Sequence, residues 1–336
     1  MTLAEHIKHE ARALGFQAIG ISRIPGATAA PLSRTLHARL LEWLRRGFHG
    51  TMSWMAREPH RRADPDAILA GCRSVISVGM NYYTGHRADE RPGRGRIARY
   101  AWGEDYHRVL MARLEALEGR IRALAPTAVT RAYVDTGPVM EKAWAQQAGL
   151  GWIGKHSNLV SAQYGSWLLL GEILTTLELA QDEPGSDLCG SCTLCLAACP
   201  TGAITEPYVV DARKCISYLT IELHHPGDEI PDDLARRMGN RIFGCDDCLD
   251  VCPYNNNAVL TTEQAFQPSA LTVAPLLTEL SDLTDRGFAA TFPRSPIRRA
   301  KHAGFLRNVR VALKNLNQSG SNAPGGCVKS TTSVFP

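Results

Sequence analysis

The sequence predicts an α+β protein built from consecutive parts. Predicted helices alternate with predicted strands over about the first 180 residues, which indicates packed layers of helix and sheet. A segment rich in cysteine follows, and apolar residues at helical spacing dominate the chain after it. We therefore expect a helix-and-sheet domain at 1–180, a cysteine-rich domain at 181–260, a basic helical segment at 261–317 and a disordered tail at 318–336.

The first elements follow from capping chemistry and apolar spacing. Thr2 and Glu5 form a capping-box pattern at the start of the first helix. The apolar run 18–21 predicts a strand, and the apolar stripe within 36–46 predicts a second helix. Residues 52–65 are rich in Trp, His, Arg and Pro without periodicity, which indicates a loop that contacts another group.

The later elements are predicted by the same patterns. Small and β-branched residues at 74–80 predict a buried strand. Leucine and isoleucine spaced by three and four between 110 and 124 predict an amphipathic helix. Further strands are expected at 128–134 and 168–175, and further helices at 139–148, 275–280, 284–290 and 300–316.

Eight cysteines lie in patterns typical of iron–sulfur proteins. Residues 189–200 read Cys-x2-Cys-x2-Cys-x3-Cys-Pro, the run with which bacterial ferredoxins hold a [4Fe–4S] cluster. Residues 245–253 repeat the ending but lack the first cysteine, which Cys215 can supply. In two-cluster ferredoxins the fourth cysteine of the run serves the other cluster. We therefore expect one cluster on Cys189, Cys192, Cys195 and Cys252, and another on Cys199, Cys215, Cys245 and Cys248.

Zinc and disulfide bonds are the alternatives for these cysteines. Zinc sites favour two separated Cys-x2-Cys pairs, and neither group has that form. Disulfides belong to oxidising compartments, and the charged amphipathic N-terminal residues do not form a signal peptide. Apolar runs such as 167–170 are too short to cross a bilayer. We therefore expect a cytoplasmic protein that contacts no membrane.

Basic residues gather toward the C-terminal end. Nine of the 37 Lys and Arg residues lie from Arg286 onward, together with none of the 33 Asp and Glu residues. Such an imbalance favours a polyanionic partner such as nucleic acid. A solvated helical face is the alternative with the same composition.

Two further motifs have competing interpretations. Residues 149–154 match the dinucleotide-binding pattern G-x-G-x-x-G, but a predicted helix rather than a strand precedes them. Their glycines instead permit the close approach of a bulky ligand. His107 stands in a block similar to the start of the Asp-x-His-x-x-Gly cobalamin motif, but Leu110 replaces the glycine. We do not expect His107 to be a metal ligand.

Asp135 stands at the expected end of a strand, before Thr-Gly-Pro. The Asp-Thr-Gly triplet of aspartic proteases requires a second copy, which the chain lacks. Asp135 is therefore a turn residue or, if burial raises its pKa, a proton donor.

The cysteine framework and four further blocks together resemble the epoxyqueuosine reductase family over residues 1 to about 316. The blocks are Asp-Thr-Gly-Pro-Val-Met-Glu-Lys-Ala-Trp at 135–144, Gly-Leu-Gly-Trp-Ile-Gly-Lys-His at 149–156, Cys-Ile-Ser-Tyr-Leu-Thr-Ile-Glu at 215–222 and Ser-Pro-Ile-Arg-Arg at 295–299. The resemblance implies reduction of epoxyqueuosine to queuosine at the wobble position of tRNA, with cobalamin reduced through two [4Fe–4S] clusters. It also implies a nitroreductase-like cobalamin-binding domain, a ferredoxin-like domain and a HEAT-like helical end.

The same resemblance assigns roles to individual residues. Asp135 matches the proton donor of the family. The residues expected around the corrin are Arg61, Tyr100, Asp135, Lys155, His156, Asn158, Ser217 and Tyr218. Those expected to contact tRNA phosphates are Arg294, Arg298, Arg299, Lys301, Arg307 and Arg310.

The remaining expectations concern the oligomeric state, the electron donor, the C-terminal end and two alternative functions. We expect a monomer that receives electrons from a reductase, a ferredoxin or a flavodoxin. Family members usually continue past Ser-Pro-Ile-Arg-Arg with further helical repeat, whereas a low-complexity tail is expected here. One alternative is a reductive dehalogenase with the same cofactors and a small organohalide substrate. Another is an electron-transfer module fused to a structural domain, without cobalt.

Overall fold

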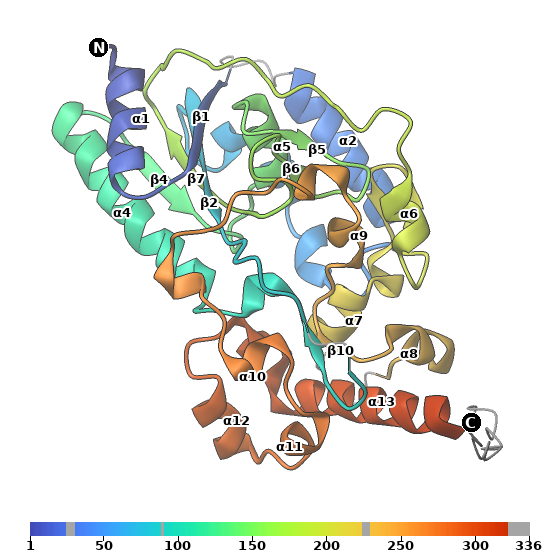
Figure 1. The fold of residues 1–336 in the computed structure, drawn as a ribbon. Helices are drawn as coiled ribbons and strands as arrows, with labels where there is room; N and C mark the ends of the chain where they lie inside the picture. Colours follow the sequence, from blue (N-terminus) through green and yellow to red (C-terminus); the bar gives the residue numbers. More distant parts are fainter. Residues whose placement is uncertain (25–30, 89–90, 224–228, 322–336) are drawn as a thin grey trace, which may run out of the picture.

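A four-stranded sheet forms the centre of the first part of the molecule (Figure 1). The computed structural model describes residues 1–24, 31–88, 91–223 and 229–321. The strands follow the order β1-β2-β7-β4 and all pair antiparallel. They are β1 (Ala18–Arg23), β2 (Ser74–Asn81), β4 (Thr130–Tyr133) and β7 (Leu168–Thr175). The predicted alternation of helix and strand is therefore confirmed, and the direction of the strands, which periodicity does not specify, is antiparallel.

Helices cover both faces of this sheet. One face packs against α1 (Leu3–Ala13) and α4 (Tyr106–Leu124), whose apolar residues meet Ile76 and Ile173. The alternate residues of the same strands point to the other face, as the two-residue period of a strand requires. That face packs against α2 (Pro31–Arg45), α3 (Pro59–Ala63) and α5 (Glu141–Gln147). The capping box at the start of α1 is confirmed by reciprocal hydrogen bonds between Thr2 and Glu5.

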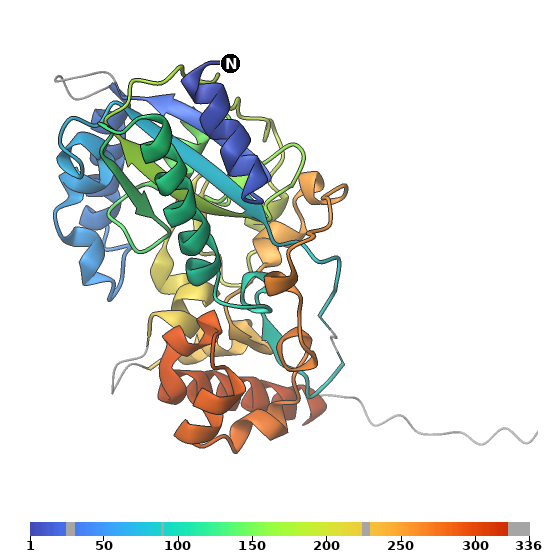
Figure 2. The ribbon, with the colours of Figure 1, turned by 90° about the vertical axis from the view of Figure 1, so that its left-hand side faces the viewer.

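The cysteine-rich part contains only short helices and strands, and it lies between the sheet and the C-terminal helices (Figure 2). Its helices are α6 (Leu194–Ala198), α7 (Ile216–Ile221), α8 (Asp232–Met238) and α9 (Asp247–Asp250). Its strands are β8 (Ile204–Glu206), β9 (Val209–Val210) and β10 (Arg241–Phe243). Strand β10 pairs in parallel with β3 (Arg96–Ile97) from the first part of the chain. The remaining hairpin, β5 (Trp152–Ile153) with β6 (Leu159–Val160), lies beside α5.

Four helices form the C-terminal part. They are α10 (Ala270–Val273), α11 (Leu277–Ser281), α12 (Asp285–Thr291) and α13 (Lys301–Ser321). Phe288, Phe292 and Phe305 pack their rings together between α12 and α13. Helix α13 continues through Ser321, so the first residues of the tail predicted from residue 318 are helical. The rest of that tail, with Cys327, lies outside the described residues. Among the described helices, none combines the length and apolar character that a bilayer crossing requires.

Asn308 fastens α13 to the cysteine-rich part. Its side chain is fully buried and donates to the Thr220 carbonyl at 2.8 Å and to the Ile242 carbonyl at 3.0 Å. The Asn308→Ala variant leaves both carbonyls without this donor, and each buried unpaired group costs about 1–3 kcal/mol. We expect the free energy of unfolding, measured by urea denaturation, to fall by at least about 1 kcal/mol. The control is Asn317→Ala, at an exposed position of the same helix, and equal stabilities of the two variants would contradict the anchoring role.

Candidate functional site

Asp135 lies at the end of β4, at the wall of a cavity of about 290 Å³. Its backbone adopts φ +56°, in the left-handed region that non-glycine residues rarely occupy. Such strain is typical of functional sites. The polar residues that line this Asp135 cavity are Tyr82, Tyr100, Tyr106, Asp135, Glu141, Lys142, Asn158, Ser166, Ser217, Cys245 and Asp246.

Two side chains from the N-terminal turn of α4 hold the Asp135 carboxylate. The Tyr106 hydroxyl donates to Oδ2 of Asp135 at 3.1 Å, and Nε2 of His107 lies 3.3 Å from the same oxygen. The hydrogen bond from His107 lowers the pKa of Asp135, although burial acts in the opposite direction. Asp135 is therefore an anion in this arrangement at neutral pH, and the raised pKa that the sequence hypothesis required for a proton donor is not observed.

His107 is held between two carboxylates. Its Nδ1 lies 2.7 Å from Oδ1 of Asp105, which also caps α4 by accepting from the backbone N–H of His107. Burial opposes a charge on the ring, but the hydrogen bonds to Asp105 and Asp135 outweigh it and raise the pKa of His107 to about 9. Both ring nitrogens are thus engaged by carboxylates.

Glu141 approaches Asp135 from the backbone side. Its Oε1 accepts from the backbone N–H of Asp135 at 2.6 Å. Burial, together with the negative charge of Asp135, raises the pKa of Glu141 to about 8. The next residue, Lys142, donates to the Ser157 carbonyl and to Oδ1 of Asn158, both at 2.9 Å. Helix α5 therefore brings a carboxyl group and an ammonium group to the cavity.

Sequence reasoning gave Tyr106, Glu141 and Lys142 no role. Each stands within one of two blocks that sequence reasoning did single out, the block that contains Asp105 and His107 and the block 135–144. The signal was their adjacency to Asp105 and Asp135, but the pairing of side chains between the two blocks depends on how α4 packs beside β4.

The cysteines divide into two sets, each around its own cavity. Cys189, Cys192, Cys195 and Cys252, the first set, line a cavity of about 50 Å³. Cys199, Cys215, Cys245 and Cys248, the second set, line a cavity of about 290 Å³. These sets are the two that the crossing rule of the sequence groups together. All nine cysteines among the described residues are free thiols.

The donor chemistry of both sets fits an iron–sulfur cluster. Four thiolates are the ligand set of a [4Fe–4S] cluster. Within the described ranges, no group of three or more His, Cys, Asp or Glu residues has an arrangement that could hold a single metal ion. Lys155 secures the loop of the first set, since its Nζ donates to the carbonyls of Gly190 at 2.6 Å and Cys192 at 2.9 Å.

The Asp135 cavity and the cavity of the second set are adjacent. Lys142, Asn158, Ser217 and Cys245 line both of them. The ammonium, amide and hydroxyl groups of this shared wall provide polar contacts for a large cofactor that lies between the second set and Asp135.

The residues that the resemblance assigned to the corrin lie in different places. Tyr100, Asn158 and Ser217 line the Asp135 cavity, and His156 lines the cavities of both cysteine sets. Lys155 lies at the first set instead. Arg61 of α3 pairs with Glu58. The Tyr218 hydroxyl is buried and accepts from the Thr51 backbone N–H, while the rest of Tyr218 packs beside Cys215 of the second set.

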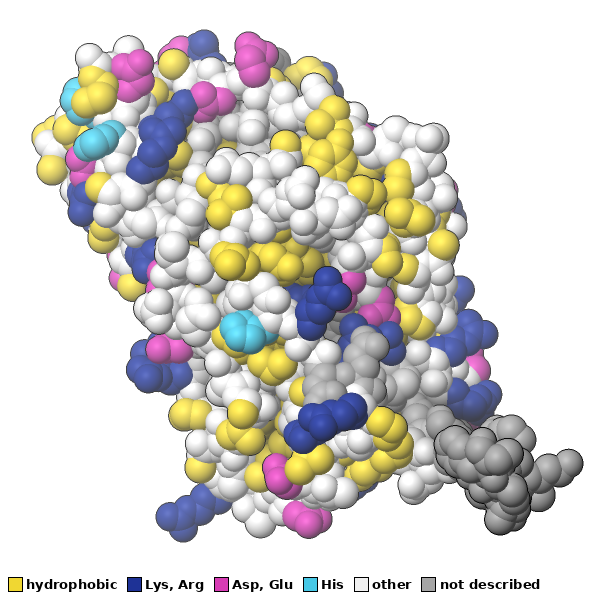
Figure 3. All heavy atoms as spheres, in the orientation of Figure 1, with side chains coloured by type: hydrophobic (Ala, Val, Ile, Leu, Met, Phe, Trp, Pro, Cys, Tyr) yellow, Lys and Arg dark blue, Asp and Glu magenta, His cyan; other side chains and the backbone are white. Residues whose placement is uncertain are grey.

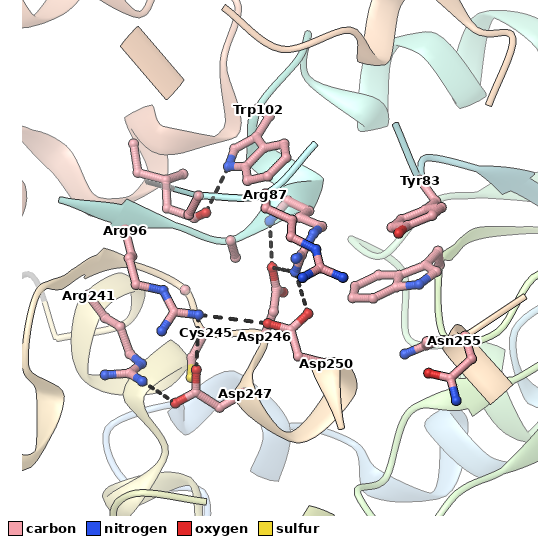
Figure 4. A pocket seen from close by; sticks show the side chains of 17 residues that line it. Tyr83, Arg87, Arg96, Trp102, Arg241, Cys245, Asp246, Asp247, Asp250 and Asn255 are labelled. Atoms are coloured by element: carbon pink, nitrogen blue, oxygen red, sulfur yellow. Dashed lines mark hydrogen bonds and ion pairs between the residues drawn. The ribbon is translucent and has the colours of Figure 1, made fainter. Parts of the chain in front are cut away.

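A further cavity of about 590 Å³ is also lined by Cys245 and Asp246 (Figure 4). Its walls carry linked ion pairs: Arg99 with Asp246 and Asp250, Arg96 with Asp247 and Asp250, and Arg241 with Asp247. These arginines come from the β3 region and from β10, whereas the aspartates flank the cysteines of the second set. The network therefore fixes the loop that carries Cys245 and Cys248.

The six basic residues expected to meet tRNA have unequal surroundings. Arg299 forms a two-point ion pair with Glu222 and lowers the pKa of Asp135, after the larger effect of His107. Arg307 is partly buried and donates to the Leu219 carbonyl, and Arg294 lies 3.7 Å from Glu104. The exposed members without a described ion pair are Arg298, Lys301 and Arg310. On the face shown in Figure 3, Lys and Arg side chains form separate spots rather than one continuous patch.

Comparisons with families and sequences give consistent matches. The family described as Epoxyqueuosine reductase QueG, DUF1730, matches residues 62–136, and the 4Fe-4S double cluster binding domain matches residues 188–255. The chain is 45% identical over 290 residues to the epoxyqueuosine reductase of a Synechocystis species, covering 85% of this chain and 99% of that protein. It is 44% identical to the epoxyqueuosine reductase of Escherichia coli, covering 93% of this chain and 81% of that protein.

Solved structures give the same result. An epoxyqueuosine reductase crystallised with an epoxyqueuosine-modified stem loop of tyrosine tRNA is similar with a TM-score of 0.85 at 30% identity, covering 95% of this chain and 83% of that one. A Bacillus subtilis epoxyqueuosine reductase, whose catalytic aspartate loop is swung out of the active site, has a TM-score of 0.84 at 29% identity over the same shares.

Proposed function

The chain belongs to the epoxyqueuosine reductase family, and we propose that Asp135 is the acid of its reaction, the reduction of epoxyqueuosine in tRNA to queuosine. The chain is thus an oxidoreductase with a double [4Fe–4S] cluster domain. The observation that supports the role of Asp135 is its position at the strained end of β4, on the wall of a cavity that shares four lining residues with the cavity of the second cysteine set.

The residues of the site have separate roles. The second cysteine set, which shares Cys245 with the Asp135 cavity, would hold the cluster nearer to the substrate, and the first set would hold the other. Cobalamin would lie at these adjacent cavities, with Asn158, Ser217 and Tyr100 beside it, and when bound it would supply the reducing metal centre. Because Asp135 is an anion at neutral pH, it must first take up a proton, which it then delivers to the oxygen. A general acid aligned with the leaving oxygen lowers the barrier to carbon–oxygen cleavage.

The proposal also covers the substrate, the electron donor and the compartment of the enzyme. The substrate is the wobble nucleoside, which leaves its stack to enter the cavity. A protein such as a reductase, a ferredoxin or a flavodoxin supplies the electrons to a monomeric enzyme, and the cytoplasm is the compartment in which we place it.

The experiment that tests the function is anaerobic turnover of tRNA that contains epoxyqueuosine. The protein is reconstituted with clusters, cobalamin and a strong reductant, and the digested nucleosides are analysed by mass spectrometry. We expect the substrate nucleoside to lose the mass of one oxygen atom only when cobalamin is present. Unchanged nucleoside, with clusters and cobalamin bound, would contradict the proposal and favour the dehalogenase alternative, which organohalide turnover then tests.

Binding of tRNA should weaken with salt through the basic residues of the C-terminal part. Arg298, Lys301 and Arg310 are exposed on η7 (Pro296–Ala300) and α13. Each phosphate contact adds about 0.7–0.9 to the slope of log affinity against log salt. Replacing all three by glutamine should therefore flatten the slope by about 2–3. The control is the single variant Arg39→Gln at an exposed position of α2, which removes one positive charge elsewhere and should leave the slope unchanged. An unchanged slope in the triple variant would exclude these residues from the interface.

A further inference from the structure

Epoxide reduction requires more protons than one carboxyl group holds. Removing the oxygen as water breaks two carbon–oxygen bonds, forms one carbon–carbon double bond, and consumes two electrons and two protons. The clusters supply the electrons. Because Asp135 is an anion at neutral pH, it must gain a proton before each of the two deliveries, so a second group has to supply that proton.

The hydrogen bonds of Asp135 restrict which group this is. Among the described residues, two side chains are hydrogen-bonded to its carboxylate, Tyr106 and His107. Burial and the charge of Asp135 raise the pKa of Tyr106, so the phenol retains its proton. An imidazolium releases and regains a proton near neutral pH far more readily than a phenol.

The surroundings of His107 suit a proton store. Its second nitrogen is hydrogen-bonded to Asp105 at 2.7 Å, which stabilises the imidazolium and fixes the ring so that Nε2 points at Asp135. The ring also stacks on Tyr106, with centroids 4.0 Å apart. The His107 side chain is 25% exposed and that of Asp105 is 27% exposed, so solvent protons can reach the pair.

We propose that His107 stores the protons of the reaction and reloads Asp135 through the hydrogen bond between them. This inference rests on the proposed function. In each transfer His107 gives its proton to Asp135, Asp135 passes that proton to the oxygen of the substrate, and His107 regains one from solvent. His107 thus acts through Asp135 rather than on the substrate.

The proposal gives turnover a specific pH dependence. The charged and titratable groups around Asp135 are Tyr100, Tyr106, His107, Glu141, Lys142 and Arg299, the last paired with Glu222, and those around His107 are Asp105 and Asp135. Because the pKa of His107 is raised to about 9, the store is full below that pH and empties above it. Turnover should therefore persist to about pH 9 and fall at higher pH.

The decisive variant is His107→Gln. Glutamine can still donate a hydrogen bond to Asp135, but it cannot carry a proton. Turnover at neutral pH should fall by about tenfold or more. The alkaline limb should also shift to lower pH, because Asp135 must then take its protons from solvent. Asp105→Asn, which removes one carboxylate from the ring, should shift the limb in the same direction by less, and His9→Gln at an exposed position of α1 should change nothing.

A second measurement does not depend on turnover. Nitrogen NMR of labelled histidine side chains in the holoenzyme should show one imidazole that titrates near pH 9, disappears in His107→Gln and titrates lower in Asp105→Asn. An imidazole of His107 that titrates at its ordinary pKa would overturn the store, as would a wild-type pH profile in His107→Gln. An inactive wild-type enzyme would instead overturn the proposed function itself, so the two failures are distinguishable.

Discussion

Replacing Asp135 with asparagine is expected to abolish turnover while the cofactors remain bound. The amide has the size of the carboxylate and can still accept from Tyr106, so the Asp135 cavity keeps its shape. It has no acidic proton to deliver. Loss of a positioned general acid typically lowers the rate by a factor of about 100 to 10,000. Single-turnover mass spectrometry of the tRNA nucleosides would measure this loss.

The same variant separates catalysis from assembly. Cluster absorbance, iron content and bound cobalamin should match those of the wild type, and so should affinity for tRNA. The control is Asp233→Asn, at an exposed position of α8. Full activity of Asp135→Asn would eliminate this residue as the acid and direct attention to Glu141, whose raised pKa, unlike the lowered pKa of Asp135, keeps a proton available near neutral pH.

Cys215→Ala is expected to remove one cluster and, with it, the electron path to the substrate. Cys215 precedes α7 and lines the cavity of the second set, where we propose that it supplies the thiol that the 245–253 motif lacks. With three thiols left, the second set cannot complete a four-cysteine site. Iron and sulfide should fall to about half. Turnover should fall by at least about 10–100-fold, because replacing a residue that merely hydrogen-bonds to a metal ligand typically causes a loss of that size.

Cys72→Ala provides the matched control for this loss. Cys72 is a buried thiol outside both sets, and its alanine variant should retain both clusters. Iron analysis and electron paramagnetic resonance of the reduced proteins would count the clusters. Two intact clusters in Cys215→Ala would show that the ligand assignment is wrong.

The parts that sequence patterns predicted are those governed by local chemistry. The leucine spacing at 110–124 identified α4, and the structure extends the helix back to Tyr106 because Asp105 caps it. The small and β-branched residues at 74–80 predicted a buried strand, and the structure shows that all residues of β2 are buried. Likewise, cysteine spacing alone was sufficient to sort eight thiols into the two sets that surround separate cavities.

The parts that the sequence did not predict depend on packing between distant segments. His107 lies 28 residues before Asp135, and only the alignment of α4 beside β4 brings them within 3.3 Å. Arg299 looked like one more basic residue of a nucleic-acid surface, yet its ion pair with Glu222 places its charge near Asp135. No periodicity or spacing encodes contacts of this kind.

The pairing of β3 with β10 and the anchoring of α13 by Asn308 determine when, during synthesis, the Asp135 cavity can be completed. The four strands of the sheet all lie before residue 176, so the sheet can close early, as N-terminal parts generally do. The Asp135 cavity, however, takes Ser217, Cys245 and Asp246 as walls, and the segment that carries them is fastened by a residue of the last helix. We therefore expect the Asp135 cavity to be complete only in a nearly finished polypeptide, and a chain that ends before Ser217 would contain Asp135 without these walls.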